Sequence, residues 1–65
     1  MIDVQTAQQL QEGIGNLLDL EETLNQIQRQ NTLDVINKSS MINMMTAGIR
    51  FIVKNIRTLI ELLSE

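Results

Sequence analysis

The chain has 65 residues with no Cys, His, Pro, Trp or Tyr, and its formal net charge is −3. A chain this short buries a small core and usually needs disulfides, a bound metal or oligomerisation to be stable. The absence of Cys and His excludes disulfides and the usual zinc and redox sites, so oligomerisation is the route that remains. A single aromatic residue argues against a β-sandwich or barrel, and the negative charge argues against general nucleic-acid binding.

Residues 3–30 are predicted to form the first helix, because apolar residues recur there at heptad spacing. Two glycines, Gly13 and Gly15, each weaken this helix by about 1 kcal/mol relative to Ala. They either admit a close neighbouring helix, or the helix breaks and restarts at Asn16, a good N-cap residue. We favour one continuous or kinked helix. The expected apolar positions are Leu10, Gly13, Leu17, Leu20, Leu24 and Ile27, with Ile14 and Leu18 widening the stripe.

Residues 31–40 are predicted to connect the first helix to the last. Within this connection Thr32 can cap a single helical turn, and Ser39 or Ser40 can cap the helix that follows. The last helix is expected over residues 41–63. A connection of this length joins antiparallel neighbours, so the fold class is all-α, a single helical-hairpin domain over residues 1–65.

The last helix is too apolar to be covered by one partner helix. Its polar residues form a narrow stripe, so about two thirds of its circumference requires burial. The hairpin is therefore expected to assemble into a homo-oligomeric helical bundle or to dock on a protein partner. Gly48 on the apolar side suggests close helix approach, while the Met residues are either ordinary core filler or an adaptable contact surface. The expected interface residues are Met41, Met44, Met45, Gly48, Phe51, Ile52, Ile56 and Leu59.

Three cations of the last helix, Arg50, Lys54 and Arg57, are the best ligand-binding candidates. Their spacing places them on one helix face within two turns, and Asn43 and Thr46 continue that stripe with hydrogen-bonding groups. Arg binds phosphate bidentately and Lys acts as a point charge, so two such stripes in an oligomer would suit a small polyanion. The stripe is otherwise a solvated face, complementary to the acidic first helix.

Two carboxylates, Glu61 and Glu21, are candidates to pair with cations of the last helix or of another chain. Glu61 follows Arg57 by four residues, so Arg57 can form a structural ion pair with it, which makes Arg50 and Lys54 the stronger ligand candidates. Glu21 lies close to the apolar side of the first helix, where it either pairs with a cation from another chain or is solvated at the edge.

Catalysis is not expected from this sequence. There is no His, Cys or Tyr to act as a base or nucleophile, and Ser39 and Ser40 beside Lys38 are better explained as helix caps. The acidic residues lack metal-ligand spacing. We therefore expect no enzyme, no cofactor and no metal site.

The expected location is the cytoplasm. The N-terminal residues lack the basic start and apolar run of a signal peptide, and the longest uncharged stretch, residues 39–49, is too short to span a bilayer. No membrane association is expected.

The segment over residues 46–56 resembles the last helix of the small phage nucleotide sponges that block the CBASS and Thoeris defence systems. The acidic segment over residues 12–19 is more loosely similar to the preceding helix of that family. The resemblance implies a hairpin oligomer in the host cytoplasm that binds cyclic oligonucleotide signals without cleaving them. It also implies that basic residues of the last helix contact phosphates, with Lys54 the residue carried over by position. The matching residues are Gly48, Ile49, Phe51, Val53 and Lys54.

Two other functions remain open from the sequence. The wide apolar face favours a protein–protein interaction module, namely an inhibitor, adaptor or structural hairpin that docks a different protein. The size and hairpin shape also fit an RNA-binding antiparallel dimer, but the net negative charge and the few basic residues weigh against it.

Overall fold

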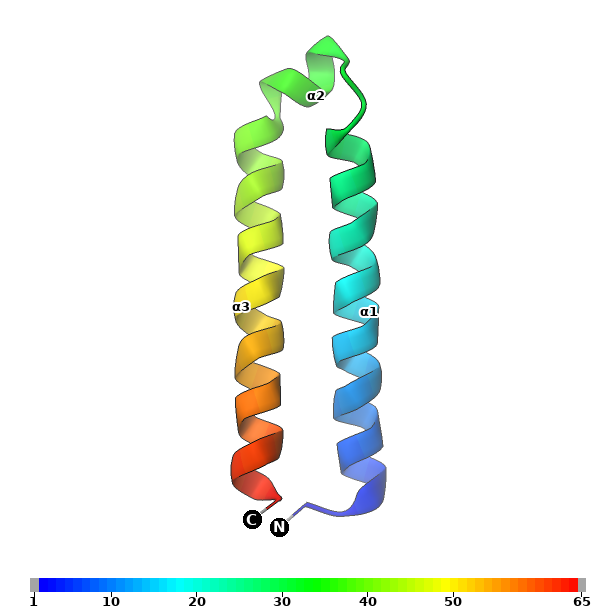
Figure 1. The fold of residues 1–65 in the computed structure, drawn as a ribbon, viewed down its shortest axis with the longest axis vertical. Coiled ribbons are helices and arrows are strands. Elements are labelled where there is room, and N and C mark those ends of the chain that lie inside the picture. The colour runs from blue at the N-terminus through cyan, green and yellow to red at the C-terminus, as the bar shows by residue number, and fades with distance from the viewer. Residues whose placement is uncertain (1, 65) are drawn as a thin grey trace.

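The computed structural model describes residues 2–64, and over this range the chain is a helical hairpin. Its elements are α1 (Val4–Gln28), α2 (Leu33–Asn37) and α3 (Ser39–Leu63). Figure 1 shows α1 and α3 side by side and antiparallel, with α2 across one end and both termini at the other. The predicted all-α hairpin with a short helical turn in its connection is confirmed.

Helix α1 begins with a side-chain cap and runs without a break. The carboxylate of Asp3 accepts a 2.7 Å hydrogen bond from the backbone N–H of Thr6, which lowers the pKa of Asp3. The helix then passes through Gly13 and Gly15, so the alternative restart at Asn16 does not occur. It ends at Gln28, two residues before the predicted end.

The connection contains the single helical turn that the sequence predicts. The hydroxyl of Thr32 accepts a 3.3 Å hydrogen bond from the N–H of Val35 and so caps α2. The expected cap by Ser39 or Ser40 is not formed, because α3 begins at Ser39 itself. Lys38 closes one helix and opens the next: its N–H donates to Asp34 and its carbonyl accepts from Ile42.

The two long helices meet along a narrow apolar seam. On α3 the seam residues recur at alternating three- and four-residue steps, as in a coiled coil. The seam on α1 passes through Ile14, whereas the expected positions Leu20 and Ile27 remain 47% and 37% exposed. The structure buries Ile14 to 4% exposed, and this residue contributes more apolar surface to the contact than its neighbour Gly13. The buried core is Ile14, Leu24, Ile42, Ile49 and Val53, with Leu17, Val35, Ile56 and Ile60 packed against it.

The hairpin leaves an unusually large surface exposed. Its principal extents are 49 × 15 × 10 Å, and its radius of gyration is 15.1 Å. A compact chain of this length has a radius of gyration of about 11 Å. The accessible surface is 5050 Å², whereas a compact monomer of this mass exposes roughly 4200 Å². A single hairpin is therefore too thin to enclose its apolar residues.

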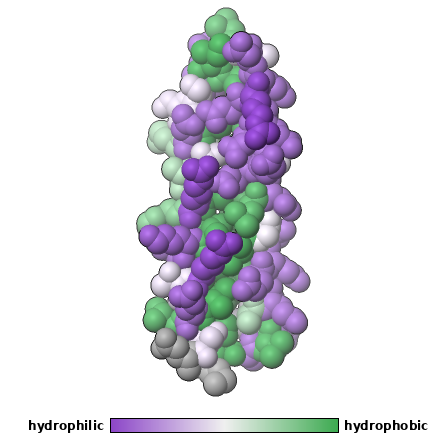
Figure 2. Space-filling model, in the orientation of Figure 1, coloured by the Kyte–Doolittle hydropathy of each residue, from purple (hydrophilic) through white to green (hydrophobic). Residues whose placement is uncertain are grey.

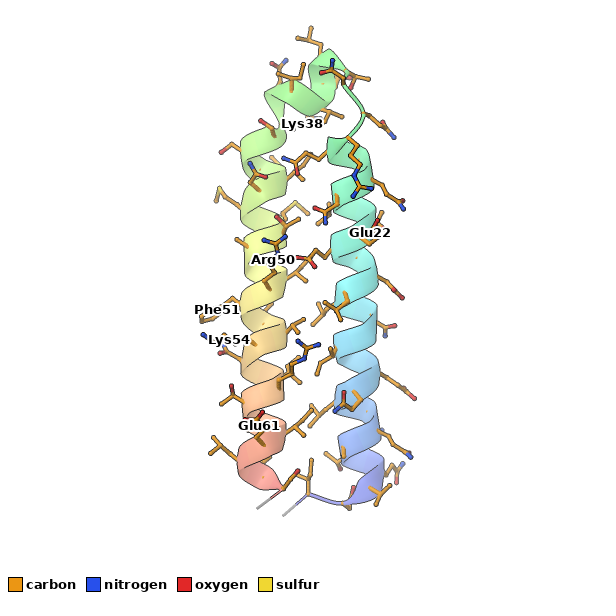
Figure 3. All side chains as sticks on the ribbon, in the orientation of Figure 1. Glu22, Lys38, Arg50, Phe51, Lys54 and Glu61 are labelled. Carbon is orange, nitrogen blue, oxygen red and sulfur yellow. The ribbon has the colours of Figure 1, made fainter. Side chains whose placement is uncertain are left out.

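Much of the exposed apolar surface lies on α3. Figure 3 shows Phe51 pointing away from α1, and the Cβ of an alanine at Gly48 would meet no atom within 4 Å. Ile56 differs from the other expected interface residues, because it packs against the hairpin core. Between residues 2 and 64 no helix has the length and apolar character needed to cross a membrane. The expected interface residues that are exposed are Met41, Met44, Met45, Gly48, Phe51, Ile52 and Leu59.

Candidate functional site

A shallow pocket of about 370 Å³ lies between α3 and the middle of α1. It brings together the three cations that the sequence singles out, on the face where polar side chains gather along both helices (Figure 2). Apolar side chains from both helices form its wall, and Thr58 adds a hydroxyl group. The residues around this pocket, which we call the cationic pocket, are Leu18, Arg50, Val53, Lys54, Arg57, Thr58 and Glu61.

Arg50 forms an ion pair across the two helices. Its guanidinium Nε donates a hydrogen bond to the Oε2 atom of Glu21. The side chain of Glu21 is only 16% exposed, while that of Arg50 is 68% exposed. Glu21 therefore pairs with a cation of its own chain, and this differs from both alternatives that the sequence left open, a solvated edge position and a cation of another chain. The pair also neutralises part of the positive charge that Arg50 brings to the pocket.

Lys54 and Arg57 supply the remaining positive charge of the cationic pocket. Within residues 2–64 the ion pairs are Arg50–Glu21 and Arg29–Glu22, the latter at 3.7 Å. The expected pair between Arg57 and Glu61 does not form within 4 Å, although Glu61 lines the same pocket.

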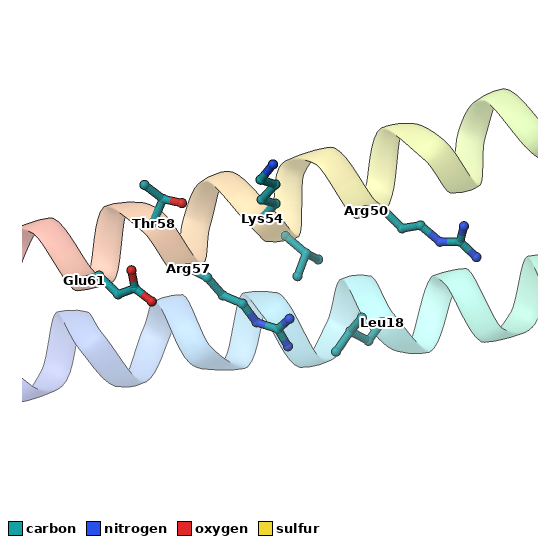
Figure 4. Close-up of a pocket in the computed structure, with 7 residues that line it drawn as sticks. Leu18, Arg50, Lys54, Arg57, Thr58 and Glu61 are labelled. Atoms are coloured by element: carbon teal, nitrogen blue, oxygen red, sulfur yellow. The ribbon is translucent and has the colours of Figure 1, made fainter.

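The two cations point in different directions. In Figure 4 the guanidinium of Arg57 extends toward α1, whereas the ammonium of Lys54 points away from it. One hairpin therefore presents its cations on a broad surface rather than in a closed cradle. An anion bound there would need groups from elsewhere to surround it.

Asn43 and Thr46 lie outside the cationic pocket. Thr46 is 7% exposed and belongs to the hairpin seam, where its hydroxyl donates a 3.0 Å hydrogen bond to the carbonyl of Asn43. The side-chain oxygen of Asn43 accepts a 2.8 Å hydrogen bond from the amide of Gln28. Asn43 thus joins the two helices by a hydrogen bond, and Thr46 is buried in the seam between them. The pocket takes its hydroxyl from Thr58 instead. The three-residue step from Thr46 to Ile49 could have placed Thr46 on the seam.

The described part of the chain has no group of three or more acidic side chains arranged to hold a metal ion. What the cationic pocket offers is charge and hydrogen-bond donors beside an apolar wall. No protein-family model, curated protein or solved structure matches this chain.

Proposed function

We propose that this chain is a non-enzymatic, self-assembling hairpin that binds and sequesters a small anionic ligand. The observation that carries the proposal is the cationic pocket, where Lys54 and Arg57 flank an apolar wall without a carboxylate partner within 4 Å in residues 2–64. A guanidinium binds a phosphate bidentately and an ammonium attracts one as a point charge, and the apolar wall suits the flat side of a base. The resemblance of residues 46–56 to the phage sponges suggests a cyclic oligonucleotide as the ligand.

Self-assembly is part of the proposal because one hairpin gives an open site. The cations diverge, and Glu61 at the edge would repel an anion held by one chain alone. A second hairpin could close the pocket with its own donors. This arrangement favours a small ligand over duplex nucleic acid, because each chain brings few cations and carries net negative charge.

Binding of a panel of cyclic di- and trinucleotides tests the proposal directly. A ligand at 100 times its Kd should stabilise the folded protein by about 2.7 kcal/mol, which a thermal shift detects. Lys54→Gln and Arg57→Gln should each weaken binding in titration calorimetry. Arg29→Gln removes an exposed cation outside the pocket and should leave binding unchanged. Absence of any shift at about 100 μM ligand would contradict a sequestering function.

A protein-interaction module is the second candidate function. The exposed apolar residues of α3 favour it, because a large exposed apolar surface on a small chain usually marks a contact site. Light scattering separates the two functions. A closed oligomer of one mass favours the sequestering protein, and a monomeric or polydisperse chain favours docking on another protein.

A further inference from the structure

Helix α3 carries a second seam on a different side from the one that packs against α1. Its residues again alternate between steps of four and three, which is the spacing of a coiled-coil contact. Each is exposed to solvent in the single hairpin. We call this row the outer stripe, and its members are Met41, Met45, Gly48, Ile52, Asn55, Leu59 and Leu62.

The outer stripe is symmetric about its middle residue, Ile52. Met41 and Leu62 lie near its two ends, and Gly48 and Asn55 flank the centre at nearly equal distance. A stripe of this kind can face a reversed copy of itself with its positions matched to within one residue. That is the condition for an isologous contact, in which residue i of one chain meets residue j of the other and the reverse.

We propose that a second copy of this chain occupies the outer stripe, with the two α3 helices antiparallel and the two-fold axis near Ile52. The exposed surface supports this occupant. It exceeds the roughly 4200 Å² of a compact monomer by about the 800 Å² that each partner buries in a standard interface. The outer stripe lies on a different side of α3 from Lys54 and Arg57, so this contact is separate from the one that would close the cationic pocket. The inference therefore does not depend on ligand binding.

Gly48 and Asn55 are the two residues of the outer stripe that are not large and apolar, and they favour the antiparallel orientation. It sets Asn55 of each chain opposite Gly48 of the other, where the open space above the glycine accommodates the side-chain amide. A parallel pair would set Gly48 against Gly48 and leave a void at that level, which destabilises a contact. The antiparallel pair also places the positive N-terminal end of each α3 beside the negative C-terminal end of the other.

Helix α1 would contribute to the edge of the same contact. Ile27 of α1 and Met41 of α3 line one apolar pocket of about 300 Å³ at the α2 end of the hairpin. An approaching copy at Met41 would therefore cover Ile27 as well. Its Leu59 and Leu62 would come from the opposite end, and the flexible Met side chains can adapt to them.

Cysteine cross-linking tests the orientation, and the absence of native Cys makes each introduced thiol unique. Ile52→Cys lies at the proposed axis, so two copies should form a disulfide rapidly under mild oxidation. Met41→Cys should not link to itself, because its two copies would lie about 33 Å apart, far beyond disulfide reach. A mixture of Met41→Cys and Leu62→Cys chains should form the mixed dimer. Gln26→Cys, exposed on α1, is the matched control and should stay reduced.

Each outcome decides the inference. Rapid self-linking of Met41→Cys would show a parallel pair and overturn it, as would cross-linking of Gln26→Cys at the rate of Ile52→Cys. A monomeric mass of the unmodified chain at about 100 μM, with no Ile52→Cys dimer, would also overturn it. Circular dichroism verifies that each variant folds. If the unmodified chain binds no cyclic nucleotide but Ile52→Cys still forms the disulfide-linked dimer, only the ligand proposal is contradicted.

Discussion

Glu21 and Arg50 join the two long helices through an ion pair in which the carboxylate is largely buried and the guanidinium is largely exposed. The pair lies at the border between the hairpin seam and the cationic pocket. It therefore contributes both to the stability of the hairpin and to the charge available to a ligand.

Loss of Arg50 should destabilise the hairpin more than loss of an exposed cation. Arg50→Gln leaves the mostly buried Glu21 without its partner, and we expect a loss of about 1 kcal/mol in the free energy of unfolding measured with urea. Arg29→Gln is the matched control, because both members of its pair are exposed, and it should change stability by less than about 0.5 kcal/mol. Equal losses of unfolding free energy in the two variants would show that the burial of Glu21 does not strengthen its ion pair with Arg50.

Neutralising Glu21 should strengthen anion binding. Glu21→Gln keeps the shape of the side chain but frees the charge of Arg50 at the cationic pocket. Calorimetric titration with a cyclic dinucleotide should give a lower Kd for this variant than for the unmodified chain. Glu22→Gln removes the same charge on the same helix outside the pocket, and a comparable gain with that variant would point to net charge alone.

Truncation of a seam residue should destabilise the protein. Ile49 is 6% exposed and packs within the core, so Ile49→Ala should cost about 2–5 kcal/mol and Ile49→Val about 0.5–1.5 kcal/mol. Thermal denaturation followed by circular dichroism measures both. A loss smaller than about 0.5 kcal/mol for Ile49→Ala would contradict its placement in the core.

The three glycines should respond differently to alanine. Each lies in a helix with no atom within 4 Å of the added Cβ, so Gly13→Ala and Gly15→Ala should each stabilise the fold by up to about 1 kcal/mol. Gly48→Ala should give the same gain within the hairpin but weaken self-association, because Gly48 lies on the outer stripe. Sedimentation at several concentrations separates the two effects. Stronger association of Gly48→Ala would contradict a close contact at this position.

Because Asp3 caps α1 with a carboxylate, we expect the stability of the protein to depend on pH in the acidic range. Its pKa is lowered in the folded state by the hydrogen bond from Thr6, so its contribution is present above the unfolded pKa. That contribution is lost as the pH falls through the folded pKa. Melting temperatures measured from pH 6 to pH 2 should fall further for the unmodified chain than for Asp3→Asn, which caps without a charge. Parallel curves for the two proteins would show that the cap does not titrate.

The sequence by itself determined the local structure of this protein. Apolar periodicity gave two long helices, and Thr32 gave the capped turn between them, because both signals act over a few residues. The apolar excess of α3 was also readable, since it depends only on which residues share a helix face. The sequence favoured a continuous or kinked first helix but left a restart at Asn16 open, and the structure shows α1 continuous through Gly13 and Gly15.

Only the tertiary structure decided how the helices are rotated toward each other. Neighbouring stripes of α1 through Gly13 and Ile14 differ by a single residue step, and a period of 3.6 does not choose between them. In the structure α3 packs against the stripe of α1 that contains Ile14. In this arrangement Glu21 pairs with Arg50, and Thr46 is buried in the seam. Such pairings depend on side chains far apart in the chain, so no local pattern encodes them.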